Sequence, residues 1–204
     1  EKSGASAVIV SKHLWGGNLL VHELKQREDG TLGVKLPETI EQSFQKALAL
    51  TPIKRQGSLS GNNRKLEIGA KDGFGWTELG EMKETCLFRT KISWEEQPQA
   101  AGVMIHADAE LRKWCQLRLE FKHGKIVMDR YNRVDGDQYY VDERPVIFYG
   151  NCVEVKLVVS GNIMLVYVND VALTSRCYEI GTGSVGIFAE YGTVLCTDTQ
   201  LLMQ

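Results

Sequence analysis

Alternation of apolar and polar side chains at every second residue is the feature that most restricts the fold of this chain. Residues 115–122 read CQLRLEFK, so that apolar side chains alternate with Gln, Arg, Glu and Lys. This pattern is typical of a strand with one buried face, and residues 86–94 repeat it. Further strands are expected at Leu19–Leu24, Ala101–His106, Lys125–Arg130, Cys152–Val159, Met164–Val168 and Val185–Glu190.

These segments follow one another too closely for parallel strands. A crossover between parallel strands needs about a dozen residues, whereas short Gly, Asn and Asp turns separate most of the segments. The sequence therefore predicts an all-β fold, an antiparallel two-sheet β-sandwich, as a single domain spanning residues 1–204. One short helix is expected after Pro37, where Ile40, Phe44, Ala47 and Leu48 have helical spacing.

Charge and hydropathy argue against two classes of partner. The chain carries 24 basic and 26 acidic residues, well mixed, with a formal net charge of −2. We expect no nucleic-acid partner, because such a surface offers no platform for a phosphate backbone. No apolar run approaches the roughly 20 residues of a membrane-spanning helix, and residues 1–10 do not read as a signal peptide. We expect a soluble chain, and the missing signal leaves its compartment open.

The five cysteines, scattered singly, show no metal-binding or redox spacing. We interpret them as small apolar core residues and favour this over disulfides, because an odd number of isolated positions implies no framework of bridges. The four histidines also lack ligand spacing. His22 and His106 are interpreted as hydrogen-bonded histidines of the sheet. We expect no metal site and no cofactor.

Candidate sugar-binding residues come from aromatic and polar side chains. Residues 57–75 contain five glycines and are interpreted as a long irregular loop with a brief strand at Leu66–Ile68. Trp76 is the best candidate to stack on the apolar face of a sugar, because it lies in this glycine-rich loop and not in an alternating strand. The complete set of candidates for a shallow sugar site is Trp76, Arg89, His106, Tyr149 and Glu190.

No catalytic constellation is evident in the sequence. Glycosidic cleavage needs two carboxyl groups placed across the scissile bond, and their spacing in sequence leaves no reliable signature. None of the candidate acids lies in a recognisable catalytic motif, so we expect no catalytic residue in this chain. These candidates are Glu78, Glu81, Glu95, Glu96, Asp129 and Glu190.

Residues 153–178 resemble the C-terminal sandwich of glycoside hydrolase family 32, the invertases, levanases and inulinases. The segments VYVND at 166–170 and LTSRCY at 173–178 follow the family pattern. Ser160 and Leu165 stand where that family has Asp and Glu, so no role of this acidic pair is carried over. Residues 14–37 resemble the passage from propeller to sandwich, and residues 183–192 resemble the closing strands of the family and of concanavalin or jelly-roll sandwiches.

This resemblance implies a non-catalytic module that supports a catalytic domain. The catalytic motifs of the family, N-D-P-N-G, R-D-P and E-C, belong to an upstream five-bladed propeller and are absent from this sequence. Residues 1–50 would then form a lead-in segment connecting to such a propeller. The resemblance further implies contact with a fructan or another glycan, and a secreted, periplasmic or cell-surface location in a bacterium.

Two alternatives remain open from the sequence. The chain could be a free-standing lectin-like carbohydrate-binding module, in which the five candidate residues form the site. It could also be an enzyme with dispersed acids, among which Asp129 and Glu190 would be tested first. Binding to a glycan panel separates the first alternative from a purely structural module.

Overall fold

The computed structural model describes residues 20–62, 64–108, 110, 112–131, 142–177 and 183–204. Strands dominate this part of the chain, with one α-helix, α1 (Glu38–Glu41), and one 3-10 turn, η1 (Phe121–His123). The strands are β1 (Glu23–Gln26), β2 (Leu32–Lys35), β3 (Lys46–Leu48), β4 (Ile53–Gln56), β5 (Ser58–Asn62), β6 (Lys65–Glu81), β7 (Thr85–Ser93), β8 (Ala100–Ala107), β9 (Trp114–Glu120), β10 (Lys125–Tyr131), β11 (Asp142–Pro145), β12 (Cys152–Ser160), β13 (Ile163–Val168), β14 (Val171–Arg176) and β15 (Ser184–Met203).

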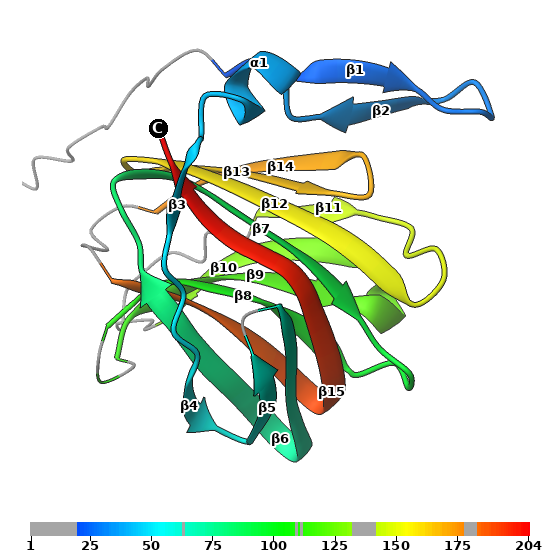
Figure 1. Ribbon diagram of the computed structural model, residues 1–204. Helices are drawn as coiled ribbons and strands as arrows, with labels where there is room; N and C mark the ends of the chain where they lie inside the picture. Colours follow the sequence, from blue (N-terminus) through cyan, green and yellow to red (C-terminus); the bar gives the residue numbers. More distant parts are fainter. Residues whose placement is uncertain (1–19, 63, 109, 111, 132–141, 178–182) are drawn as a thin grey trace, which may run out of the picture.

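Two antiparallel sheets pack face to face and share their longest strands (Figure 1). The first half of β15 pairs with β8 and continues through β9 and β10 to β11, which we call the first sheet. Its second half pairs with β7 and continues through β12 and β13 to β14, the second sheet. The described strands pair only in antiparallel fashion, so the predicted all-β sandwich is confirmed.

The glycine-rich segment is a pair of strands, so its interpretation as an irregular loop is wrong. β5 and β6 form a hairpin, and β6 runs along both halves of β15. The glycines allow close approach of backbones at the bend. A Cβ atom at Gly57 would lie 2.3 Å from the carbonyl oxygen of Gly69, and one at Gly75 would lie 2.4 Å from the same oxygen. Gly75 lies within β6 at a place where backbones crowd together, whereas Gly57, with φ of 79°, also forms the bend between β4 and β5.

The main core lies between the sheets and is built from the inward side chains of the alternating segments. Most predicted strands are confirmed. β1 begins at Glu23, so the strand expected at Leu19–Leu24 is displaced, and Leu19 lies outside the described residues.

Cys86 and Cys196 are buried core residues as expected, but Cys152 is exposed. Cys115 and Cys177 form a disulfide between β9 and the end of β14, which corrects the prediction of free thiols. The two cysteines lie 62 residues apart and meet only because both point into the core.

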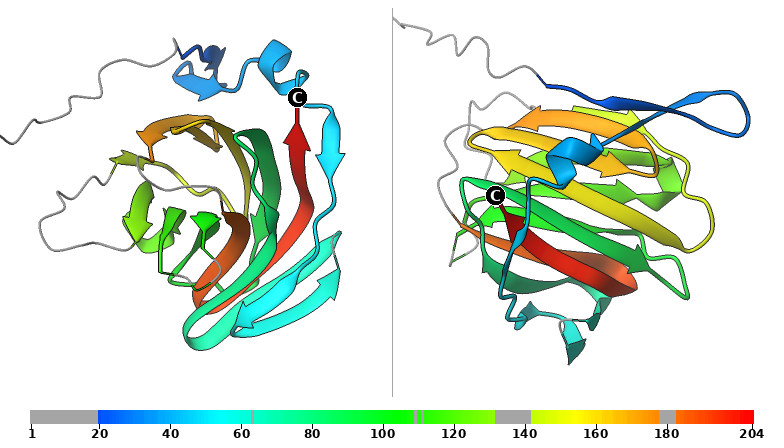
Figure 2. Two further views of the ribbon diagram at one scale, coloured as in Figure 1. Left: turned by 90° about the vertical axis from the view of Figure 1, so that its left-hand side faces the viewer. Right: turned by 45° about the horizontal axis from the view of Figure 1, so that its top comes forward.

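The N-terminal part of the described chain covers the outer face of the second sheet (Figure 2). Leu36 and Phe44 pack on Val158, Leu165 and Tyr167 in a second apolar cluster. The predicted helix is shorter than expected: α1 ends at Glu41, and Ala47 and Leu48 belong to β3, which pairs with β15. Pairing with an open sheet edge thus prevails over the helical spacing. Among the described residues, no helix has the length and hydropathy to cross a membrane.

Candidate functional site

The outer face of the first sheet carries a half-buried row of polar side chains. On β9, Trp114, Gln116, Arg118 and Glu120 point to this face, while the intervening residues fill the core. Gly102 of β8 lies between Arg118 and Phe188 of β15, since it pairs with both. A Cβ atom at Gly102 would lie 1.8 Å from the carbonyl oxygen of Leu117. The glycine therefore keeps the space between β9 and β15 free of a side chain.

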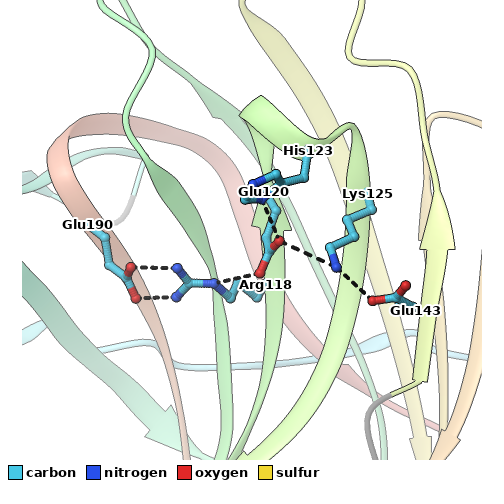
Figure 3. A network of polar contacts seen from close by, with 6 residues as sticks. All are labelled: Arg118, Glu120, His123, Lys125, Glu143 and Glu190. Carbon is cyan, nitrogen blue, oxygen red and sulfur yellow. Dashed lines mark hydrogen bonds and ion pairs between the residues drawn. The ribbon is translucent and has the colours of Figure 1, made fainter.

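Arg118 reaches across that space to Glu190 of β15 (Figure 3). Its Nη1 and Nη2 atoms donate to the two carboxylate oxygens of Glu190, the second at 2.6 Å, and its Nε donates to Glu120 at 3.2 Å. Only 19% of the Arg118 side chain and 16% of the Glu190 side chain are exposed. Burial opposes the charge of Arg118, but the bonds to Glu190 and the attraction of both carboxylates outweigh it and raise the pKa of the guanidinium.

The charged row continues beyond Glu120 toward the edge of the sheet (Figure 3). The second carboxylate oxygen of Glu120 accepts a bond from His123 at 3.0 Å and lies 3.8 Å from Nζ of Lys125. Lys125 in turn donates to Glu143 of β11 at 2.7 Å. Alternating charges thus link four strands on one face, and we call Arg118, Glu120, Glu190, Lys125 and Glu143 the charged row.

Aromatic side chains border the charged row on its β15 side. Phe74 of β6 pairs with Glu190 and stacks on Phe188, with ring centroids 5.4 Å apart. Trp76 lies next to them, 1% exposed, in a small apolar cluster with Met104 and Phe188. The site therefore joins a planar ion pair to a partly exposed aromatic ring, which is a combination found in recognition sites for small polar molecules.

The ion pair retains unused hydrogen-bonding capacity. A guanidinium has about five N–H groups and a carboxylate about four acceptor positions. Arg118 uses three of these donors in its bonds to described residues. The remaining donors of Arg118 and the remaining lone pairs of Glu190 are available to hydroxyl groups of a ligand. Within the described residues, no three His, Cys, Asp or Glu side chains gather to hold a metal ion.

Of the five predicted sugar-binding residues, only Glu190 belongs to the charged row. Trp76 lies in β6 and is 1% exposed, so its predicted position in a loop with a free ring face is wrong. His106 ends up in β8, 8% exposed and with φ of 53°. Burial lowers the pKa of His106, and its Nδ1 makes no hydrogen bond to any described residue, contrary to the hydrogen-bonded histidine that we expected. His22 does have its partner, the hydroxyl of Tyr167 at 2.9 Å.

Arg89 and Tyr149 are not brought to the charged row. Arg89 lies on the outer face of the second sheet, where it donates to Glu41 at 3.2 Å and to Gln200 at 2.7 Å. Tyr149 lies between β11 and β12 and is 71% exposed. No hydrogen bond, ion pair or ring contact in the described part of the chain joins it to the other four candidates.

Sequence reasoning missed Arg118 and Glu120. Both lie on the polar side of the clearest alternating segment, so their exposure to one face was predictable. The pairing of Arg118 with Glu190, 72 residues away, was not. The missing information was that β8 alone separates β9 from β15, with a glycine at the crossing point.

No protein-family model matches the sequence, and no curated protein matches it significantly. Solved structures with the same fold were found nevertheless. A carbohydrate-binding module of Bacillus subtilis, CBM66, superimposes with a TM-score of 0.63 at 13% identity, over 74% of this chain and 95% of that chain. An exo-inulinase from Aspergillus awamori gives 0.62 at 16% identity, over 89% of this chain and 34% of that chain.

A β-fructofuranosidase from Aspergillus kawachii, complexed with glycerol, gives a TM-score of 0.61 at 14% identity, over 85% of this chain and 30% of that one. The chain thus spans about a third of the length of these two larger proteins. At such identities the likeness defines the fold alone. The protein is an all-β sandwich of the architecture found in that carbohydrate-binding module and in part of those larger chains.

Proposed function

We propose that this chain is a non-catalytic glycan-binding sandwich of the kind attached to family 32 glycoside hydrolases, with a fructan as its glycan. The observation that carries the proposal is the Arg118–Glu190 pair on an open sheet face beside Phe74. Hydroxyl groups on neighbouring sugar carbons can bind the guanidinium and the carboxylate together, while the ring of Phe74 contacts apolar C–H groups. The shared fold with CBM66 supports a role in binding.

The surroundings of the acidic residues favour binding over hydrolysis. A glycosidase needs one carboxyl group that donates a proton and a second on the other side of the bond. Glu190 and Glu120 both accept hydrogen bonds from the same guanidinium. Glu78 is bound by Arg55 and Glu81 by Lys83, and Glu95 and Glu96 are exposed. None of these carboxylates has the apolar surroundings that keep a general acid protonated.

An upstream five-bladed propeller in the same protein is the proposed partner. Two considerations support it: the chain resembles the sandwich that follows such a propeller, and it matches about a third of the two larger fructan-related chains. The Cys115–Cys177 disulfide supports a secreted, periplasmic or cell-surface location, because disulfides persist in oxidising compartments. The lead-in segment, of which residues 1–19 lie outside the described part, would connect the two domains.

A free-standing lectin-like module is the second candidate. It is favoured by one observation, that the match to CBM66 covers 95% of that separately solved module. Both candidates place the glycan at the charged row, so binding data alone do not separate them. The domain context upstream of Glu1 does.

Isothermal titration calorimetry against fructose, inulin, levan and unrelated glycans tests the proposal. We expect the wild-type chain to bind a fructan and Arg118→Ala to lose that binding at least tenfold. Lys91→Ala serves as the matched control, because Lys91 pairs with Asp198 on the surface outside the charged row. Absence of binding to every glycan, or release of fructose by the purified chain, would refute the assignment.

A further inference from the structure

A groove adjoins the charged row at the bend between the two sheets. This groove has a volume of about 1140 Å³ and lies where β6 and β15 pass from one sheet to the other. Its floor and walls come from the β5–β6 hairpin, the segment after β7 and residues 191–195 of β15. Phe74 lines the groove and also pairs with Glu190. The groove therefore begins where the charged row ends.

Tyr191 lines this groove and has an unusual backbone conformation. It follows Glu190 directly, has φ of 47° and is 56% exposed. A left-handed conformation is uncommon for a non-glycine residue and persists only where its surroundings enforce it. Gln99 donates its backbone N–H to the carbonyl of Glu190 at 3.0 Å, and Gly192 packs against Pro98 so closely that a Cβ atom would lie 2.7 Å from it. The loop before β8 thus fixes the bulge on both sides.

An exposed aromatic ring on a fixed backbone has a clear physical use. A backbone that is already fixed does not have to be ordered when a ligand stacks on the ring, which lowers the entropic cost of binding. The core gains little from Tyr191, because more than half of the side chain stays in water. The strained bulge is therefore better explained by presentation of the ring to a ligand than by packing.

The charged lining of the groove disfavours anionic ligands. Acidic side chains outnumber lysines by four to two, and all six are exposed. Such a surface repels polyanions at moderate ionic strength. Gln97 and Thr193 line the groove with side chains that make no hydrogen bond to another described residue, so their donors and acceptors are available for hydroxyl groups. The charged residues of the lining are Lys65, Lys71, Glu67, Asp72, Glu95 and Glu96.

We propose that the groove is a second glycan-binding subsite, which receives the neighbouring units of an uncharged oligosaccharide whose first unit binds at Arg118–Glu190, with Tyr191 as its stacking platform. This inference rests on the proposed function and adds a chain-length preference to it. Tyr191 follows Glu190 directly at the bulge of β15, and Phe74 both pairs with Glu190 and lines the groove, so the two subsites adjoin. A single sugar occupies the first subsite alone, whereas a longer chain gains the contacts of the groove.

Calorimetry with fructose and with an inulin oligosaccharide of several units tests this inference. The variant is Tyr191→Asn, because asparagine tolerates the left-handed conformation and removes the ring. The matched control is Tyr149→Asn, which removes an even more exposed tyrosine from outside the groove lining. We expect Tyr191→Asn to weaken oligosaccharide binding about tenfold and to leave fructose binding unchanged, whereas Tyr149→Asn changes neither. Thermal unfolding of both variants checks that the fold is retained.

The possible results separate the two proposals. If the wild-type chain binds the oligosaccharide and Tyr191→Asn binds it equally well, the second subsite is refuted and the proposed function stands. Equal losses in both tyrosine variants, or equal affinities of the wild-type chain for fructose and the oligosaccharide, also refute the second subsite. If the wild-type chain binds no glycan, both proposals fail. Stronger binding of polygalacturonate than of the inulin oligosaccharide would overturn the assignment of an uncharged ligand.

Discussion

Replacing Glu190 by glutamine keeps the size of the side chain and removes the charge that faces Arg118. The two side chains are 16% and 19% exposed. Their pairing therefore lies between a surface ion pair, worth about 0.2–1 kcal/mol, and a buried one, whose disruption costs about 3–5 kcal/mol. Arg118 keeps its bond to Glu120 in the variant, which limits the loss. We expect Glu190→Gln to lower the free energy of unfolding by about 2 kcal/mol.

A double-mutant cycle in urea measures this coupling. Arg118→Met, Glu190→Gln and the double variant are unfolded, and with a slope of about 2 kcal/mol per molar urea the midpoint of Glu190→Gln falls by about 1 M. The Lys91–Asp198 pair serves as a control, because its side chains are 50% and 69% exposed, and its coupling should stay below about 0.5 kcal/mol. An Arg118–Glu190 coupling as small as that of the control would refute the reasoning.

Three further predictions concern packing, thiols and pH. Gly102→Ala should cost about 3 kcal/mol of unfolding free energy, because its Cβ would meet the carbonyl of Leu117 at 1.8 Å; urea unfolding of this variant with a wild-type midpoint would contradict it. A thiol reagent at neutral pH should label Cys152 alone in the native chain, Cys86 and Cys196 only after unfolding, and Cys115 and Cys177 only after reduction. Burial protects the free core thiols and raises the pKa of Cys196 to about 12. Labelling of all five cysteines without reductant would disprove the disulfide. Burial also raises the pKa of Tyr167 to about 12, from an unfolded value of about 10. The contribution of Tyr167 to the free energy of unfolding is therefore complete below pH 10 and is lost as the pH rises toward 12, a loss of at most about 3 kcal/mol. Tyr167→Phe should abolish this loss in alkaline unfolding curves.

The arrangement of strands was largely predictable, because each alternating segment buries one face. Residues 115–122 show this directly: their apolar side chains line the core, and Arg118 and Glu120 point outward. The glycine-rich segment misled for a physical reason. Glycine marks turns and also places where backbones crowd together; Gly69 and Gly75 are of the second kind, and Gly57, with φ of 79°, is of both.

The candidate site could be predicted only in part. Glu190 was found as an acidic residue near the closing strand, but its partner comes from another strand, and no local pattern links the two. Trp76 was misplaced because a long bent strand buries it on the outer face of the first sheet. Arg89 donates a hydrogen bond to Glu41, and the position of Glu41 depends on how the N-terminal segment folds back over the second sheet. The sequence therefore did not indicate that Arg89 is used in this contact. Contacts between distant segments depend on topology, which alternation does not encode.

The central claim, that a glycan binds at the Arg118–Glu190 pair, is tested most directly by a nitrogen–proton NMR titration with an inulin oligosaccharide. We predict that the Nε–H signal of Arg118 and the backbone signals of Glu190 and Phe74 shift together and saturate. Signals around Arg89, on the opposite sheet face, should stay in place. Saturable shifts that cluster around Arg89 or Tyr149, with no change at Arg118, would contradict the account.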